Sequence, residues 1–285
     1  MERYKWHLDR TSHKAICPKC GQKRFVLYVD DSGTPAGEEY GRCDRERSCG
    51  YSRYPGKEVS SNNTPTYTPT PKIITPMRFD SRVLSEFNRI DSNLFPFFAS
   101  LVTPLRAMEK WQLYNVGCYI DNVIFWQRDI HGEIRGGKLI RYDKTGHRVK
   151  DDKPASWTHY QKVFNPYKTG DKLEQCLFGE WLLAKYPDAP VVVVESEKTA
   201  LIMSAIAHSN HIWLASGGSQ MLKDSSRTRV LEGRDVLLMP DQGQYWNWHM
   251  VAQRLHCQID NRCESFNQGD DILDFVLAHK EELKR

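Results

Sequence analysis

The chain has 285 residues, and its 40 Lys and Arg against 36 Asp and Glu give a formal net charge of +4. Hydrophobic residues make up 40% of the chain, including 8 Trp, 13 Tyr and 11 Phe, which excludes a disordered chain and predicts about two domains. No apolar run is long enough to cross a bilayer, and the N-terminus MERYKWHLDR lacks the apolar stretch of a signal peptide. We therefore expect a cytoplasmic protein without a membrane partner, whose eight cysteines are thiols or metal ligands.

The first predicted module, residues 1–56, contains two pairs of cysteines. Cys17 and Cys20 have CxxC spacing followed by glycine, and Cys43 and Cys49 follow after a predicted strand, FVLYVD. Four thiolates can close a tetrahedral structural Zn²⁺ site, which would hold together a module too small for a core of its own. This pattern predicts a zinc β-ribbon. The alternatives are unliganded buried cysteines, because CDRERSC is longer than a usual knuckle, or His13 in place of one cysteine.

The remaining cysteines have no paired spacing, and we interpret them as packing residues: Cys118, Cys176, Cys257 and Cys263. Residues 57–77, KEVSSNNTPTYTPTPKIITPM, are rich in Pro, Thr, Ser and Asn and predict a disordered linker. The rest of the chain then divides into residues 78–188 and residues 189–285.

Residues 78–188 predict a basic α+β subdomain. Helical spacing in RVLSEFNRI, DSNLFPFFASLV and PLRAMEKWQLYNVG precedes three predicted strands, NVIFWQRD, GGKLIRYD and HRVK. A basic aromatic loop, SWTHYQKVFNPYKTGDK, and a short helix, LFGEWLLAKY, follow. Between Arg135 and Lys172 there are 10 Lys and Arg against 4 Asp and Glu, so this segment carries +6 and the remainder −2. Such a concentration suits phosphate binding, although a solvated basic loop is an equally simple interpretation.

Residues 189–285 alternate strands and helices. VVVVE, HIWLAS and DVLLMPD predict buried strands, whereas KTALIMSAIAH, YWNWHMVAQRLH and DDILDFVLAHKEELKR predict helices. Strands that are apolar throughout and alternate with helices indicate an α/β domain with a parallel sheet covered on both faces. In such sheets the site lies at the carboxyl ends of the strands.

Two of these strands end on an acid. Glu195 follows VVVV, and Asp241 follows VLLMP. Two carboxylates at neighbouring strand ends would form a pair that can bind a divalent cation. The alternative is that each acid caps the helix that follows it. Because both acids occupy equivalent places in one α/β unit, we favour the site.

The order E-x-x-K-T-A after a valine strand, then SGGS, then P-D-x-G resembles the Toprim domain of bacterial primases, topoisomerases and some nucleases. The resemblance implies a Rossmann-like parallel sheet, with Glu195 in acid/base chemistry and Asp241 as the first acid of a DxD motif that binds Mg²⁺. The second acid is absent, because Gly243 stands in its place. In primases an acidic stretch follows DxD, and QGDDILDFVL resembles it, with Asp270, Asp271 and Asp274 as candidates. We choose Asp271 as the third Mg²⁺ ligand, although acids in a first helical turn also complement the helix dipole.

The upstream sequence extends this resemblance. LYNVGCY followed by NVIFWQRDIHGEIRGGKLIRYD is similar to a passage that precedes the Toprim strand in bacterial replicative primases. The module order also matches, with a zinc ribbon, a basic subdomain and a Toprim domain, and is similar to primase-like proteins of bacterial mobile elements. The resemblance implies metal-dependent RNA primer synthesis with structural Zn²⁺ and catalytic Mg²⁺ or Mn²⁺. It implies single-stranded DNA and nucleotides as partners, with a replicative helicase as a further candidate.

Five residues are candidates for contacts with nucleic acid or nucleotide. Lys138 and Arg141 are three apart on a predicted strand and point to opposite faces, so at most one faces the crevice, and we choose Arg141. Lys198 lies one helical turn after Glu195 and could reach a phosphate or form a surface salt bridge. Lys150 and Trp157 lie in the basic aromatic loop, where aromatic rings can stack on bases, although Trp157 could equally belong to a small core.

Two classes of function are consistent with these patterns. The first is a primase-like nucleotidyltransferase or, as a second enzyme, a Toprim nuclease. The other class is a DNA-binding module that has lost chemistry together with the second Asp of DxD. Metal dependence and the response to neutralising Glu195 distinguish the two classes. We favour the enzyme.

Overall fold

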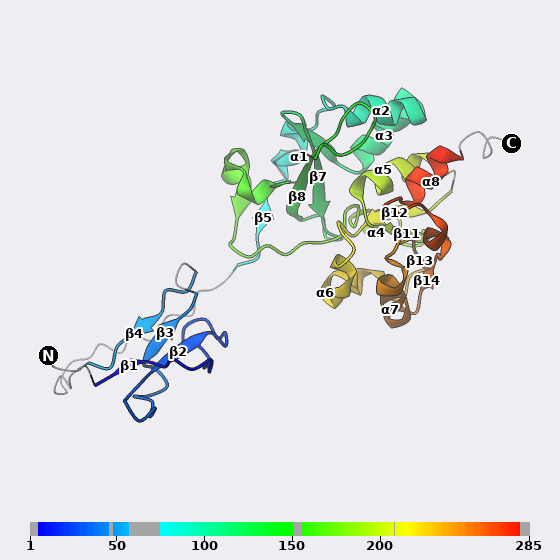
Figure 1. Cartoon of the computed structure of the whole chain (residues 1–285). Helices are drawn as coiled ribbons and strands as arrows, with labels where there is room; N and C mark the ends of the chain where they lie inside the picture. Colours follow the sequence, from blue (N-terminus) through cyan, green and yellow to red (C-terminus); the bar gives the residue numbers. More distant parts are fainter. Residues whose placement is uncertain (1–4, 46–47, 57–74, 151–155, 208, 280–285) are drawn as a thin grey trace. The chain divides into compact units, whose positions relative to one another are not determined.

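The computed structural model describes residues 5–45, 48–56, 75–150, 156–207 and 209–279 (Figure 1). The chain divides into two compact units, Met1–Pro71 and Lys72–Arg285. Most of the predicted linker, residues 57–74, lies outside the described residues. Its predicted end at Met77 is too late, because Met77 is buried in the second unit and its backbone N–H donates to the Lys172 carbonyl over 2.7 Å.

The first unit is a small antiparallel sheet of four strands in the order β1-β2-β3-β4. The predicted strand FVLYVD forms β2. Three of the cysteines are buried with Phe25 in a core of only a few side chains. Such a core is too small to stabilise a domain by itself. The strands are β1 (His7–Leu8), β2 (Phe25–Val29), β3 (Gly41–Cys43) and β4 (Ser52–Arg53).

The second unit begins with an antiparallel sheet in the order β10-β5-β8-β7-β6, with β9 paired to β8. HRVK pairs beside the end of β8 through one isolated bridge, Arg148 with Tyr142, and not as a full strand, and the Asp143 carboxylate closes the turn between them by accepting from the backbone N–H groups of Thr145 and His147. The elements are β5 (Arg78–Phe79), α1 (Arg82–Glu86), α2 (Leu94–Leu101), α3 (Pro104–Leu113), β6 (Val116–Tyr119), β7 (Asn122–Arg128), β8 (Ile134–Arg141), β9 (Ser156–Trp157), η1 (Thr158–Tyr160), η2 (Lys162–Tyr167) and β10 (Lys168–Thr169).

A parallel sheet in the order β12-β11-β13-β14 follows, as the alternation of strands and helices predicts. β14 was not predicted, because two residues of CQID are too short to show a pattern. The elements are α4 (Leu182–Lys185), β11 (Val191–Val194), α5 (Glu197–Ile206), β12 (Ile212–Ala215), η3 (Met221–Lys223), α6 (Ser225–Thr228), η4 (Arg229–Leu231), β13 (Val236–Leu238), α7 (Tyr245–Leu255), β14 (Gln258–Ile259), η5 (Arg262–Ser265) and α8 (Ile272–Ala278). The predicted extension of α8 beyond residue 279 lies outside the described residues.

The two sheets of the second unit share one hydrophobic core. Phe125 and Ile140 of the antiparallel sheet belong to the same buried cluster as Val191–Val194 of the parallel sheet. The backbone of Phe178 pairs with Ala215 at the end of β12, which joins the connecting segment to the parallel sheet. Residue 188 therefore separates two sheets and not two compact units. Within the described part of the chain, no helix combines the length and apolarity needed to cross a membrane.

Candidate functional site

The four predicted cysteine ligands converge in the first unit. The Sγ atoms of Cys17 and Cys49 lie 3.7 Å apart, those of Cys20 and Cys43 lie 3.9 Å apart, and all four lie within 4.8 Å of one another. A tetrahedral zinc site with Zn–S bonds of about 2.3 Å has S–S edges of about 3.8 Å. These distances fit a structural zinc ion, and His13 is not part of the group.

The two strand-end acids also come together. β11 and β13 are adjacent parallel strands, with Val193 opposite Leu238, so Glu195 and Asp241 follow neighbouring strands at the same edge of the sheet. The backbone of Asp241 lies close enough to the Glu195 carboxylate to lower its pKa. The loop after β12 closes over the same place, because the Gly217 N–H donates to the Glu195 carbonyl over 2.9 Å.

Neither acid caps a helix. The N-cap of α5 is Ser196, whose side chain accepts from the Thr199 N–H, and the N-cap of α7 is Gln244. The helix-capping interpretation therefore fails for Glu195 and Asp241. Both carboxylates therefore lie at the strand ends without a capping role.

Asp271 behaves differently, because it caps α8. Its carboxylate accepts from the N–H groups of Leu273 and Asp274, and Asp274 accepts in return from the Asp271 N–H, which forms a capping box. The Thr199 hydroxyl also donates to Asp271. Its carboxylate oxygens already have protein donors, so the helix-terminus interpretation describes Asp271 better than the predicted role of direct metal ligand.

Burial raises the pKa of both strand-end acids. Burial is the largest cause for Glu195, whose pKa rises to about 7. Burial and then the negative charges of Glu195 and Asp271 raise the pKa of Asp241 to about 8. One oxygen of Glu195, Oε1, is buried without a hydrogen-bond partner. A cation between the two carboxylates would supply the missing partner and offset the repulsion.

These carboxylates fit a magnesium or manganese ion held by few protein ligands. Among the described residues, the four cysteines are the one group of three or more potential ligands within 4.8 Å, so the acids offer a pair and not a closed cage. Mg²⁺ is commonly held by one or two carboxylates, with waters and substrate phosphates completing the shell. Gly243 has a φ of 76°, a conformation that glycine tolerates best, and it supplies no ligand.

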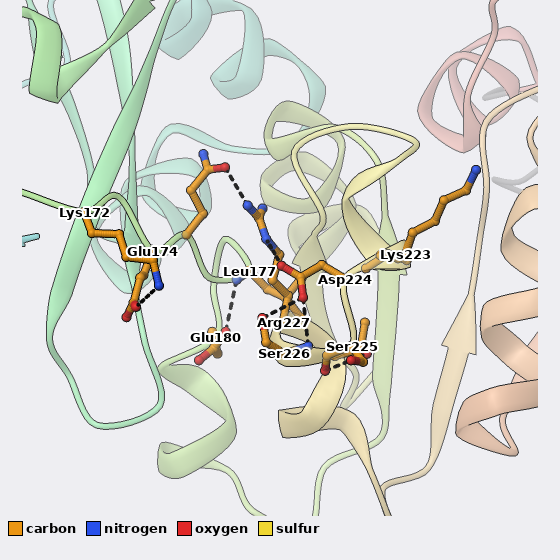
Figure 2. Close-up of polar contacts among 12 residues, drawn as sticks. Lys172, Glu174, Leu177, Glu180, Lys223, Asp224, Ser225, Ser226 and Arg227 are labelled. Carbon is orange, nitrogen blue, oxygen red and sulfur yellow. Dashed lines mark hydrogen bonds and ion pairs between the residues drawn. The ribbon is translucent and has the colours of Figure 1, made fainter. Parts of the chain in front are cut away.

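Glu180 is a buried acid whose carboxylate, unlike that of Glu195, has a hydrogen-bond partner for each oxygen. Its Oε1 accepts from the Ile130 N–H over 3.1 Å, and its Oε2 accepts from the Leu177 N–H over 3.0 Å. Figure 2 shows the second of these bonds. Burial raises the pKa of Glu180, but both of its oxygens have backbone partners. Glu195 has no such complete set.

The raised pKa values predict a stability change with pH. In the unfolded chain both acids titrate near pH 4, so between about pH 4 and pH 8 the folded protein holds more protons, and its stability falls as pH rises. We expect Asp241→Asn to remove part of this loss and to raise the melting temperature at pH 8.5 by about 4 °C, with little change at pH 5. Differential scanning calorimetry without added divalent cations measures this.

Asp235→Asn is the matched control, because Asp235 is exposed and precedes the same strand, β13. We expect its melting temperature to equal that of the wild type at both pH values. Equal melting temperatures of the wild type and Asp241→Asn at pH 8.5 would contradict the claim that ionised Asp241 destabilises the fold.

Lys138, and not Arg141, faces the strand ends. The Lys138 ammonium donates to both Glu197 oxygens over 3.1 and 3.2 Å and to the Gly217 carbonyl over 3.1 Å. The choice of Arg141 was therefore wrong. Side chains alternate along β8, so Lys138 shares its face with Ile140 in the common core, whereas Arg141 is exposed on the other face.

The Lys138–Glu197 ion pair predicts a thermodynamic coupling. The Glu197 side chain is only 3% exposed, so Lys138→Met would leave a buried carboxylate unpaired and cost about 3 kcal/mol of unfolding free energy. We expect Lys138→Met/Glu197→Gln to recover most of this loss. Urea unfolding of the single and double variants measures the coupling, and additive losses would show that the pair is not formed.

The other predicted contact residues lie in different places. The Lys198 ammonium donates to the Gly146 carbonyl over 3.2 Å, and its charge lowers the pKa of Asp241, so it lies near the pair. It forms no salt bridge with another described residue. Trp157 is directly opposite Lys138 across β8 and β9, and cross-strand neighbours share a face. Lys150 is exposed next to residues 151–155, which lie outside the described residues.

Sequence reasoning missed two partners of the site. Glu197 is buried in the first turn of α5, where an acid would ordinarily be explained by the helix dipole. Thr199 contacts Asp271 across 72 residues of sequence. Neither contact leaves a local pattern, because both depend on how β8 and α8 pack against α5.

Comparisons with known proteins agree with the zinc assignment and identify the family. The model of a zinc beta-ribbon finger matches residues 4–64. A comparison with curated proteins produced no match. The primase fragment of the bacteriophage T7 primase-helicase protein aligns with 95% of this chain and 97% of its own, at 14% identity and a TM-score of 0.43.

Two bacterial structures align with less of this chain. The zinc-binding and RNA polymerase domains of the Aquifex aeolicus primase align over 73% of this chain at 16% identity and a TM-score of 0.37, and this chain spans 52% of that one. The RNA polymerase domain of the Mycobacterium tuberculosis primase aligns over 72% of this chain and 70% of its own, at 16% identity and a TM-score of 0.36. Values this low carry no conclusion about activity. One family model matches residues 92–242, more than half of the chain, so the protein belongs to the family described as domain of unknown function DUF6371.

Proposed function

We propose that this protein is a primase-like Toprim nucleotidyltransferase that makes short RNA primers on single-stranded DNA, in the replication of a mobile element. The observation that carries the proposal is the Glu195–Asp241 pair, which lies at the ends of adjacent parallel strands, caps no helix and leaves Glu195 Oε1 without a partner. The Toprim resemblance of the sequence supports the same assignment. Single-stranded DNA and nucleotides are the proposed partners, and a helicase is a further one.

Both acids take part in the proposed chemistry. Asp241 and Glu195 would hold Mg²⁺ or Mn²⁺, which, when bound, neutralises triphosphate charge and favours ionisation of the primer 3′ hydroxyl. A bond forms between the 3′ oxygen and the α-phosphorus, the bond to the β-phosphate bridging oxygen breaks, and pyrophosphate leaves. The hydroxyl proton passes to the Glu195 carboxylate, which acts as the general base.

Cations near the pair are suited to hold phosphate. Lys198 approaches it from α5, and Lys138 approaches it from β8 but is already paired with Glu197. Trp157 lies opposite Lys138. The rings of His159 and Tyr160 follow Trp157, with centroids 4.0 Å apart, and Tyr160 is exposed. Aromatic rings beside lysines are the usual arrangement for binding single strands.

Primer synthesis tests the proposal. Purified protein is incubated with single-stranded DNA, labelled ribonucleotides and Mg²⁺ or Mn²⁺, with Glu195→Gln in parallel. Short products that require wild-type Glu195 support a primase. Shortening of end-labelled DNA would instead indicate a Toprim nuclease. If neither protein makes or cleaves nucleic acid while both bind DNA equally, the protein is a binding module that lacks the second acid at Gly243.

A further inference from the structure

The outward face of α7 carries aromatic side chains that have no role in the site described above. Trp246 is 72% exposed and Met250 is 66% exposed, although both are large and apolar. The Tyr245 ring stacks on that of His249 with centroids 5.7 Å apart and packs edge-on against Trp246 at 5.3 Å. The opposite face of the helix is buried in the common core, so this outer face is not needed for folding.

This aromatic face is close in the chain to the acid pair. The Gln244 N–H donates to the Asp241 carbonyl over 3.0 Å, so a single tight turn connects Asp241 to the first residue of α7. The loop after β12, which contacts Glu195 and Lys138 through Gly217, continues along α7, where Trp248 Nε1 donates to the Ser219 carbonyl over 3.1 Å. The rings therefore lie on the helix that flanks the site.

The segment that packs against α7 carries a net positive charge, which suits a polyanion. α7 contains no Asp or Glu, and the packed segment from Ser219 to Arg229 contains three cations and one acid, Asp224. Asp224 accepts from Ser226 over 2.7 Å and pairs with Arg227 at 3.5 Å, so Lys223 and Arg229 carry the exposed positive charge of this segment. Figure 2 shows Lys223 extending away from this pair, and Lys223 is exposed. α7 itself offers a protein partner few charged side chains with which to form ion pairs.

We propose that the outer face of α7 is a stacking platform for bases of single-stranded nucleic acid at the Glu195–Asp241 pair. This inference rests on the proposed function only in naming which strand passes the site. Trp246 and Tyr245 stack on bases, and the cations of the neighbouring segment contact the phosphates. A single strand would then be held on two sides of the acid pair, by α7 and by the rings near Lys138.

Fluorescence anisotropy of a labelled oligothymidylate tests this platform without turnover, using the full chain and no added Mg²⁺ or Mn²⁺. We expect Trp246→Ala to weaken binding about tenfold, and Trp246→Phe to keep most of the affinity because its ring still stacks. Leu105→Ala is the control, since Leu105 is equally exposed, at 72%, on α3. Unchanged affinity in Trp246→Ala would overturn the proposal.

Two further readouts separate this proposal from its alternatives. Sedimentation velocity of wild type and Trp246→Ala detects a protein interface, and loss of self-association with unchanged DNA affinity would replace the platform by a dimer contact. Primer synthesis is measured separately. If the protein makes primers but Trp246→Ala binds DNA as tightly as the wild type, only the stacking platform is contradicted. If Trp246→Ala weakens DNA binding but the wild type makes no primers, only the proposed enzyme activity is contradicted.

Discussion

Removing zinc will unfold the first unit while the second unit stays folded. The first unit has a core of only a few side chains around its four cysteines, whereas the second has an extensive core of its own. Zinc binding supplies about 10–16 kcal/mol to small domains of this kind, more than such a core can replace. We expect Cys43→Ser, at a fully buried ligand, to lower bound zinc from one ion per chain to none.

Hydrogen exchange followed by mass spectrometry locates the effect. Peptides covering β2 and β3 should lose protection in Cys43→Ser, whereas peptides covering β7, β8 and β11 should match the wild type. Cys257→Ser is the matched control, because Cys257 lies outside the zinc group in the second unit. Retained protection of β2 in zinc-free protein would show that the metal is not structural.

Glu195→Gln will lower the rate of primer synthesis about 10³-fold and leave DNA affinity within about twofold of the wild type. The substitution keeps the shape of the side chain and removes both the proton acceptor and one metal ligand. The lysines and aromatic rings proposed to contact phosphates and bases remain, and we expect these to determine affinity. Single-turnover primer extension and anisotropy on the same preparations measure the two quantities.

Asp235→Asn again serves as the control, because it neutralises an acid at the other end of β13 from Asp241. Its rate should equal that of the wild type. A Glu195→Gln protein with equal loss of rate and affinity would instead indicate that Glu195 organises the fold. A protein that retains its rate would remove Glu195 from the chemistry.

The sequence predicted the parallel sheet and its acids because each depends on local pattern. VVVV must be buried, and a strand buried on both faces in an α/β order places Glu195 at the site edge. The zinc ligands were predictable because two Cys pairs with a strand between them constrain each other in space. A place for Asp271 at the start of a helix, where its charge complements the dipole, was visible as an alternative in the sequence, whereas the capping box was not.

The rest depended on packing between distant segments. Arg141 and Lys138 lie on opposite faces of β8, but only the contact with α5 shows which face meets the strand ends. HRVK forms only one bridge, Arg148 with Tyr142, beyond the turn at Asp143, and its local pattern did not show that the pairing stops there. β14 consists of two residues that pair with β13 only after α7 has returned the chain to the sheet.

Direct binding of Mn²⁺ to the second unit's acid pair tests the central claim. Mn²⁺ is titrated with the wild type or with Glu195→Gln/Asp241→Asn at pH 8.5, where the wild-type acids are mostly ionised. The concentration of free Mn²⁺ is measured by electron paramagnetic resonance. We predict one Mn²⁺ site in the wild type that is absent from the double variant and weakens as pH falls below about 7. Equal Mn²⁺ binding by both proteins would contradict a metal site at the strand ends.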